Sequence, residues 1–520
     1  MVEPMVERVR VFTGWLTGLC VGVAALVVAA EPADRPNVLF IAVDDLKPAI
    51  GVFGDPVAQT PHMDRLAARG TAFINAHCQQ AVCAPSRVSL LTGLRPDATR
   101  VWDLKTRFRE HLPDVVTLPQ RFKRVGYASV GMGKIFDFRS VEDPQTMDPI
   151  SWTEPFEGVP APANQTFSYR NPEIVRHIEH ALAEAEDPPT GWSERLKLIF
   201  PDGQPAFERA DVPDSEYQDG AMTDLAVERL AGFAASGEPF FLAVGFKKPH
   251  LPFNAPERYW RMYDRDALPL AEFTRAPGGA PDYAPQPGWE LRFVYDVPKT
   301  GPIPLDLQRD LVHGYYATTS FIDAQVGRLL DALDEHGLAD DTVVVLWGDH
   351  GFHLGDHAIW CKHTNYEQAT RSPLIVVAPG IGVPGGVSDA PVDLLDVYPT
   401  LMDLVGLEPA GELHGVSLRP ILHDPSARVK ALATSQYPRG SETGPLMGYA
   451  YRSERYRLVQ WRRLAERGAA EIAGSVVATE LYDYAADPLE TRNLVDDPAY
   501  ADVLVEMRTL AAAHRDATLP

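Results

Sequence analysis

Five short apolar runs set the strongest limit on the fold of this chain. They show no alternation of polar and apolar residues, which is typical of strands buried on both faces, as in a parallel sheet. The runs occupy residues 37–43, 127–130, 240–245, 342–347 and 373–378. Stretches with helical periodicity lie between them, at residues 62–69, 88–94, 223–235 and 307–336. This order predicts an α/β fold with a doubly wound, mostly parallel sheet flanked by helices.

Ionisable residues directly follow four of these runs. They form the clusters Asp44-Asp45, Gly131–Lys134, Lys247–His250 and Gly348–His350. One such cluster is more often a turn or a helix cap than a site. The carboxyl ends of parallel strands, however, share one edge of a sheet, and ligands bind there. Four clusters together therefore predict a shared functional site at this edge.

The remaining sequence divides into two kinds of region. Residues 139–219 and 264–305 are rich in Pro, Gly, Asp and aromatic residues, which indicates lids or binding loops. After residue 428 the pattern changes to short strand-like pieces, which indicate a smaller α+β subdomain with an antiparallel sheet. The predicted division is a catalytic domain at 31–428 and a C-terminal subdomain at 429–520.

Residues 1–30 are predicted to be a signal peptide. Charged residues precede an apolar stretch at 11–28, and the small residues Ala29 and Ala30 follow it. This pattern is typical of secretory signals and predicts export to the periplasm or the medium. The alternative is an uncleaved membrane anchor, because the stretch nearly reaches spanning length. The sequence has no other segment of that kind, so we expect no stable membrane association after signal removal.

Charge and cysteine content exclude some classes of protein. The 71 acidic residues exceed the 48 basic ones and give a net charge of −23. Such a chain repels nucleic acid, and any anionic ligand needs a local cationic pocket. Of four cysteines, Cys20 lies in the signal, which leaves Cys78, Cys83 and Cys361. Three cysteines cannot all pair, so a disulfide framework does not hold the fold together.

Cys83 lies in the most informative segment, Val82–Arg87. Pro85 suits a first helical turn, so we expect Cys83 just before a helix N-terminus. Free N–H groups and the helix dipole favour negative charge there, and Arg87 adds a cation. A lone cysteine in this position is more often a structural residue than a reactive one.

The pattern Cys-x-Pro-Ser-Arg resembles the signature of the sulfatase family, in which the cysteine is oxidised to formylglycine. Further segments resemble sulfatase motifs in the expected order, at residues 37–45, 92–93, 131–134, 248–250, 348–351, 481–490 and 493–494. Segments closer to the iduronate 2-sulfatase branch lie at 79–89, 301–304, 325–330 and 435–439. The resemblance implies an alkaline-phosphatase-like fold and the hydrolysis of sulfuric esters.

The resemblance also implies the residues of a site. Its metal ligands are Asp44, Asp45, Asp349, His350 and an oxygen of the modified Cys83. Carboxylates suit one Ca²⁺ ion, whereas a histidine ligand is unusual for it. The residues implied around the sulfate are Arg87, Lys134, His250 and Lys362. Cationic groups of this kind are what a sulfate ester requires in an acidic protein.

The implied reaction begins with a hydrated aldehyde at Cys83, which attacks sulfur. His250 or Lys362 then protonates the leaving sugar oxygen, and the second hydroxyl of the hydrate expels sulfate. The implied substrate is a sulfated uronic acid or related sugar attacked from the chain end, and the implied partner is a formylglycine-generating maturation enzyme. Asp137 stands where the iduronate branch commonly has a histidine. Either Asp137 acts as a weak base, or His353 or His357 assists instead.

Two alternatives remain open at this point. A phosphate mono- or diester hydrolase of the same superfamily would share the metal-binding strand ends but usually has a Ser or Thr nucleophile. The Cys83 motif argues against it. A catalytically silent protein that binds sulfated glycans is the second alternative, and Asp137 is its only support.

Overall fold

A seven-stranded sheet forms the centre of the fold in a computed structural model, which describes residues 1, 35–158, 168–286, 288–442, 444–464 and 474–518. The strand order is β12-β2-β11-β8-β1-β6-β4. The strands are β1 (Asn37–Val43), β2 (Thr71–Phe73), β4 (Ala128–Gly133), β6 (Phe240–Phe246), β8 (Thr342–Gly348), β11 (Leu374–Val377) and β12 (Gly386–Ser388). The predicted signal peptide lies, apart from Met1, outside the described residues.

Four neighbouring strands of this sheet confirm the predicted parallel arrangement. β1 pairs in parallel with β6 and β8, and β4 pairs in parallel with β6. The prediction was wrong for the run at 373–378, because β11 runs antiparallel to both β8 and β2. A continuous apolar run indicates burial on both faces but carries no information on strand direction.

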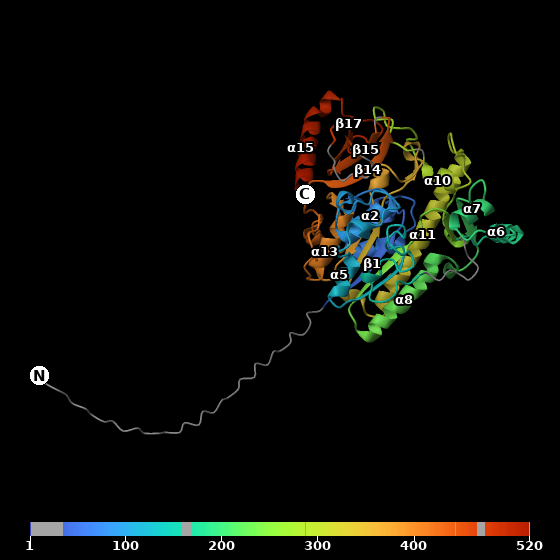
Figure 1. Cartoon of the computed structure of the whole chain (residues 1–520), viewed down its shortest axis with the longest axis horizontal. Helices are drawn as coiled ribbons and strands as arrows, with labels where there is room; N and C mark the ends of the chain where they lie inside the picture. The colour runs from blue at the N-terminus through green and yellow to red at the C-terminus, as the bar shows by residue number, and fades with distance from the viewer. Residues whose placement is uncertain (2–34, 159–167, 287, 443, 465–473, 519–520) are drawn as a thin grey trace, which may run out of the picture. The chain divides into compact units, whose positions relative to one another are not determined.

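Helices cover both faces of the sheet (Figure 1). Phe40 packs in one core with α2 (Cys83–Thr92), α5 (Leu118–Arg124) and α13 (Val397–Leu404). Its neighbour Ile41 packs in another core with α1 (Pro61–Arg69), α8 (Gln218–Ser236) and α11 (Leu305–Glu335). Successive side chains of a strand point to opposite faces, so β1 contributes to both layers. This is the predicted doubly wound arrangement.

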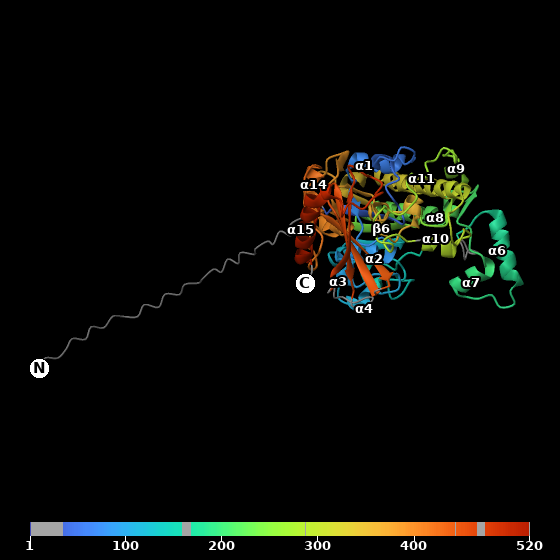
Figure 2. The same ribbon diagram turned by 90° about the horizontal axis from the view of Figure 1, so that it is seen from above.

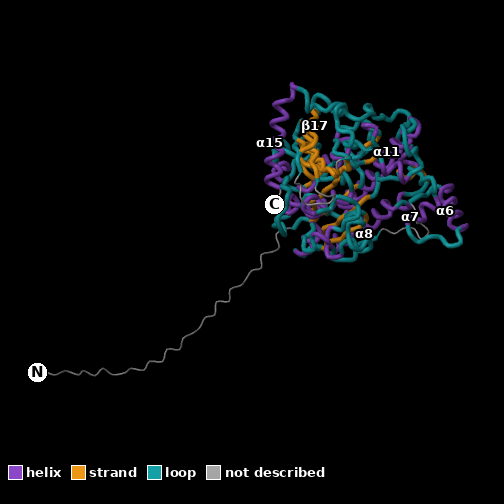
Figure 3. Tube along the Cα trace, turned by 45° about the horizontal axis from the view of Figure 1, so that its top comes forward, coloured by secondary structure: helices purple, strands orange, loops and turns teal. Residues whose placement is uncertain are grey.

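A separate antiparallel sheet lies near the C-terminus, as predicted. Its strands are β14 (Ala433–Ser441), β15 (Gly444–Arg452), β16 (Tyr456–Arg463) and β17 (Val476–Asp483), in that order. The last helix, α15 (Ala501–Thr518), packs along this sheet (Figure 3). The boundary of the C-terminal subdomain at residue 428 stays a prediction.

The two regions predicted as lids contain regular structure. Residues 139–219 include α6 (Pro172–Glu184), α7 (Trp192–Ile199) and β5 (Phe207–Ala210), which pairs with β7 (Phe253–Pro256). Residues 264–305 include α10 (Trp289–Val294). In Figure 2, α6 and α7 lie on the side of the sheet layers away from α15.

Short elements complete the described chain. They are α3 (Pro96–Thr99), α4 (Phe108–His111), α9 (Glu257–Trp260), α12 (Glu367–Thr370), α14 (Arg419–His423), β3 (Ala76–His77), β9 (His353–Leu354), β10 (Trp360–Cys361) and β13 (Val392–Asp393). Within the described ranges, none of the helices has the length and apolar character needed to cross a bilayer.

Candidate active site

The predicted clusters meet at one edge of the central sheet. Asp44 and Asp45 follow β1, and Asp349 follows β8, its parallel neighbour. The backbone N–H of Asp45 donates to Oδ1 of Asp349 at 3.0 Å, although 304 positions separate the two residues. Lys134 follows β4 at the same edge. The strand order therefore explains why residues far apart in sequence share one site.

Cys83 is the first residue of α2 rather than the residue before it. Its side chain is buried, with Sγ 3.4 Å from Oδ1 of Asp44 and 3.5 Å from Nε2 of His350. Burial and the charge of Asp44 raise the pKa of the thiol well above its usual range. The unmodified cysteine is therefore protonated at neutral pH and is a poor nucleophile.

The predicted metal ligands form one buried cluster. Asp44, Asp45, Cys83 and His350 each offer a ligand atom, and these atoms all lie within 4.8 Å of one another. Asp349 borders the cluster, with Oδ1 3.5 Å from Nε2 of His350. Burial and the nearby carboxylate of Asp44 raise the pKa of Asp349, because like charges crowd there. A divalent cation would relieve this repulsion, so the donor set fits a hard metal ion.

Three of the predicted sulfate-binding cations contact these carboxylates. Arg87 donates through Nε to Asp349 at 2.9 Å and also pairs with Asp44. Nζ of Lys134 lies 2.6 Å from Oδ2 of Asp44. Nζ of Lys362 lies 2.7 Å from Oδ1 of Asp45. Burial lowers the pKa of both lysines, but the adjacent carboxylates more than offset it and keep them charged.

His250, the fourth predicted sulfate contact, faces acceptors on both sides of its ring. Nδ1 lies 2.6 Å from the carbonyl oxygen of Leu251, and Nε2 lies 3.0 Å from Oε1 of Glu290. Both ring nitrogens of His250 therefore lie within hydrogen-bond distance of an oxygen atom. Nζ of Lys248 donates to the carbonyl groups of His250 and Pro252 and thereby holds the loop.

Glu290 is a residue of this site that the sequence did not reveal. Its Oε2 lies 2.9 Å from Nζ of Lys362, so one carboxylate bridges Lys362 and His250. Burial raises the pKa of Glu290, but these two cations hold it well below its usual range. Gln286 donates to the carbonyl of Lys362 and accepts from the backbone of Trp289, which fixes the start of α10. No motif marks Glu290, because it lies in the irregular segment 264–305.

A cavity of about 950 Å³ is lined by part of this site: Cys83, Lys134, His250, Glu290 and Lys362. Large aromatic side chains, all at least half exposed, stand around it: Phe138, Trp192, Trp289 and Phe293. Trp192 comes from α7, and Trp289 and Phe293 come from α10. The two segments predicted as lids or binding loops therefore do supply walls of the site.

Asp137 does not have the properties of a base. Arg139 donates to both of its carboxylate oxygens, at 2.8 and 2.7 Å, and Nζ of Lys134 lies 3.7 Å away. Burial raises the pKa of Asp137, but Arg139 and Lys134 bring it down to about 2. The proposed substitutes do not replace it, because among the described lining residues of the cavity there is neither His353 nor His357. Their Nε2 atoms instead bond Thr364 and the carbonyl of Leu489.

The described cysteines form no disulfide framework, as expected from their odd number. Cys78, Cys83 and Cys361, the cysteines of the described chain, are all buried and unpaired. Cys83 reaches the cavity, whereas Cys78 and Cys361 do not appear among its described lining residues. Only Cys83 is therefore placed for chemistry.

Comparison with known proteins agrees with this geometry. The sulfatase family model matches residues 36–407, and the model of the C-terminal region of N-sulphoglucosamine sulphohydrolase matches residues 355–516. Iduronate 2-sulfatase from Homo sapiens is 32% identical, with 94% of this chain and 96% of that protein covered. A sulfatase from Formosa agariphila is 30% identical, with coverages of 92% and 87%.

Among solved structures, the phosphonate monoester hydrolase from Silicibacter pomeroyi aligns with a TM-score of 0.68. It is 25% identical and covers 93% of this chain and 96% of its own. The family model spans most of the chain, and its range contains the predicted metal ligands and sulfate contacts. The chain belongs to the sulfatase family.

Proposed function

We propose that this protein removes sulfate from a sulfated carbohydrate, acting on a sulfated uronic acid or related sugar at a chain end. The observation that carries the proposal is the buried Cys83, which lies between acidic metal-binding groups and the cations Arg87, Lys134 and Lys362. The similarity to iduronate 2-sulfatase supports the substrate class. Cys83 is proposed to be oxidised to formylglycine by a maturation enzyme, and one Ca²⁺ ion is the proposed metal.

The proposed metal would be held by Asp44, Asp45, Asp349 and His350. It would supply positive charge beside the reacting sulfate, and the formylglycine would supply an oxygen nucleophile. Arg87 and Lys134 neutralise charge on the sulfuryl oxygens as the ester bond breaks. Asp137 and Arg139 form an ion pair beside Lys134, which limits the positions open to its ammonium group.

His250 is the proposed proton donor to the leaving sugar oxygen. Its ring lines the cavity between the carbonyl oxygen of Leu251 and Oε1 of Glu290, and a general acid must present a protonated ring nitrogen there before bond cleavage. Nζ of Lys362 contacts Oε2 of Glu290 and adds positive charge close to His250. A uronate carboxylate next to the sulfate would also be attracted to Lys362.

Peptide mass spectrometry across residues 78–95 tests the modification. Protein from a host with the maturation machinery should carry an aldehyde at position 83, and protein from a host without it should carry the thiol. Only the first should release sulfate from defined sulfated saccharides. Full activity of the thiol form would refute the mechanism. Confirmed modification with binding but no sulfate release would favour the silent glycan-binding protein.

Hydrolysis of phosphate or phosphonate esters is the second candidate activity. The similarity to a phosphonate monoester hydrolase favours it. Matched aryl sulfate, phosphate and phosphonate esters separate the two, because the leaving group is the same in each. Sulfatase function requires the highest kcat/KM for the sulfate ester, and a higher value for either phosphorus ester would reverse the assignment.

Export is a further part of the proposal. The predicted signal at 1–30 would bring the enzyme to polysaccharides outside the cytoplasm. N-terminal sequencing of protein recovered from the periplasm or medium should begin near Glu31. A start at Met1 in the membrane fraction would instead indicate the uncleaved anchor.

A further inference from the structure

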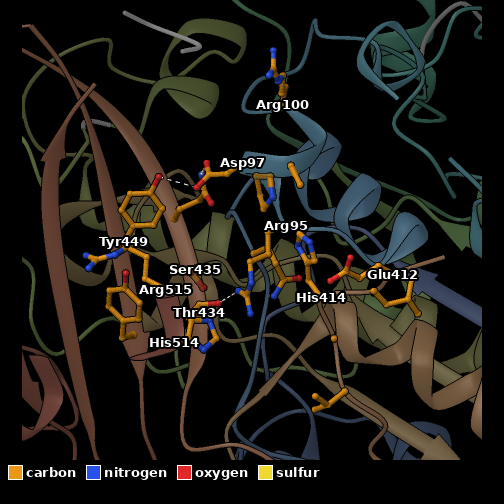
Figure 4. Close-up of a pocket in the computed structure, with 18 of the residues that line it drawn as sticks. Arg95, Asp97, Arg100, Glu412, His414, Thr434, Ser435, Tyr449, His514 and Arg515 are labelled. Atoms are coloured by element: carbon orange, nitrogen blue, oxygen red, sulfur yellow. Dashed lines mark hydrogen bonds between the residues drawn. The ribbon is translucent and has the colours of Figure 1, made fainter. Parts of the chain in front are cut away.

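A second cavity, of about 600 Å³, lies between the C-terminal sheet and the segments at 95–100 and 412–416 (Figure 4). None of its described lining residues lines the cavity at Cys83. Figure 4 shows Arg95 beside His414 in the centre, with Thr434 and His514 next to them and Tyr449 close to Asp97. This cavity is therefore separate from the proposed active site.

The pairing of β14, β15 and β16 explains why polar side chains line one wall of the second cavity. Thr434 of β14 pairs with Tyr451 of β15, and Gln436 pairs with Tyr449. On the other side of β15, Met447 pairs with Arg462 of β16. Residues paired across antiparallel strands project to the same face, as do alternate residues of one strand. One face of this sheet thus presents hydroxyl, amide and guanidinium groups together beside α15.

Positive charge predominates in this second cavity. Arg95, Arg462 and Arg515 lie close enough to Tyr451 that all three lower its pKa, against burial, which raises it. Burial and Arg95 also lower the pKa of His514 to about 4. Asp97 and Glu412 are the carboxylates among the described lining residues. In a protein of net charge −23, this is a local reversal of sign.

Some donors in the second cavity have no acceptor. Nε of Arg95 and Nε of Arg462 are buried without a hydrogen-bond partner in the described structure. The carboxylate of Asp97 accepts instead from the hydroxyl of Tyr449 at 2.8 Å, from Nε2 of Gln436 at 2.7 Å and from Nε1 of Trp102 at 2.9 Å. Buried donors without acceptors are costly, and an anion entering the cavity would satisfy them.

A third hollow, of about 1340 Å³, borders both cavities. It shares Asp97 and Arg100 with the second cavity, and it shares Leu104, Trp289 and His363 with the cavity at Cys83. Lys105 and Arg439 also line it. A chain-like anionic ligand that follows this hollow would extend from the cavity at Cys83 toward the second cavity.

We propose that the second cavity binds a sulfate- or carboxylate-bearing sugar unit of the same polysaccharide whose terminal unit reaches Cys83. The inference rests on the proposed function for its choice of ligand. Guanidinium groups match planar and tetrahedral oxyanions through paired hydrogen bonds, and the half-buried Tyr449 adds aromatic surface for the sugar ring. The second cavity thus extends recognition beyond the unit that is cleaved.

The double variant R462Q/R515Q tests this proposal by calorimetry. The probes are a sulfated hexasaccharide, the same hexasaccharide without sulfate, and a sulfated disaccharide too short to span both cavities. We expect about tenfold weaker binding of the sulfated hexasaccharide, because charge-assisted hydrogen bonds are lost. Disaccharide binding and sulfate release from the disaccharide should not change.

Arg508→Gln is the matched control, because Arg508 is an exposed residue of α15 outside the cavity. Hexasaccharide binding equal to wild type in the double variant, or an equal loss in R508Q, would overturn the proposal. An unchanged midpoint of thermal unfolding excludes misfolding. If wild type releases no sulfate at all, the proposed function fails, while the binding comparison still decides the role of the second cavity.

Discussion

The cavity at Cys83 and the second cavity both present cations, but their charge balance differs. At Cys83, Arg87, Lys134 and Lys362 contact the buried carboxylates of Asp44, Asp45 and Asp349. In the second cavity, Arg95 pairs with Asp393 at 3.3 Å, and four arginines line the cavity with two carboxylates, Asp97 and Glu412, among the described lining residues. Arginines can hold an anion. The sulfate-ester cleavage proposed at Cys83 also uses a nucleophile and a metal ion held by carboxylates. Changes at the two places should therefore have different consequences.

Cys83→Ala should produce the largest effect. Loss of the nucleophile should lower sulfate release by about 10⁴-fold or more. Binding of the sulfated hexasaccharide at the second cavity should remain. Steady-state release and calorimetry measure the two properties. Cys78→Ala is the control, since Cys78 is equally buried but lies outside the cavity; an equal loss in that variant would remove the special role of Cys83.

Removal of the metal should come next. Treatment with a chelator, or Asp349→Asn, should lower kcat by about 10³-fold, because a bound cation supplies several kcal/mol of charge stabilisation. Added Ca²⁺ should restore the chelated wild type but not the variant. Asp340→Asn, at the opposite end of β8, provides the control. Full activity in the presence of the chelator would contradict a role of a bound metal ion in the reaction.

Arg139→Gln should reduce stability in a pH-dependent way. The pKa of Asp137 is depressed from 3.8 to about 2, so its stabilising contribution is present above about pH 4 and disappears as pH falls toward 2. Without Arg139 most of that contribution is lost, about 2 kcal/mol at pH 7. Denaturant unfolding of wild type and variant should therefore converge near pH 2. A constant difference at all pH values, or the same loss in Arg107→Gln, would contradict this explanation.

Glu290→Gln should have the smallest effect. The amide keeps a hydrogen bond to His250 but removes the negative charge that lies between His250 and Lys362, so we expect about tenfold lower kcat with little change in KM. Glu272→Gln, an exposed change in the same segment, is the control. A fall in KM instead would mean that Glu290 competes with the substrate anion for Lys362.

The sequence predicted those parts of the site that follow from a local apolar pattern combined with the general geometry of parallel strands. The runs ending at Val43 and Trp347 indicated buried strands, and the rule for parallel strands then brought Asp44 and Asp349 together. It failed for the direction of β11, because burial on both faces is the same for either orientation. Glu290 could not be predicted as a site residue, because a single carboxylate in an irregular segment belongs to no periodic pattern and its sequence neighbours do not indicate what it contacts.

The second cavity was also not predicted from the sequence. Its polar wall depends on which residues of β14, β15 and β16 pair with one another, and alternation along any one strand does not specify this register. Arg95 and Arg515 join it from segments more than four hundred positions apart. Only the folded chain brings these arginines into one place.

The short helix α10 contributes both to the cavity wall and to the charged groups of the site. Trp289 and Phe293 form part of the entrance, and Glu290 between them touches Lys362 and His250. Because Gln286 ties the start of this helix to the backbone at Lys362, the cavity wall and the carboxylate of Glu290 belong to one structural unit. An outward displacement of α10 would therefore separate Glu290 from Lys362 and His250 while it widened the cavity.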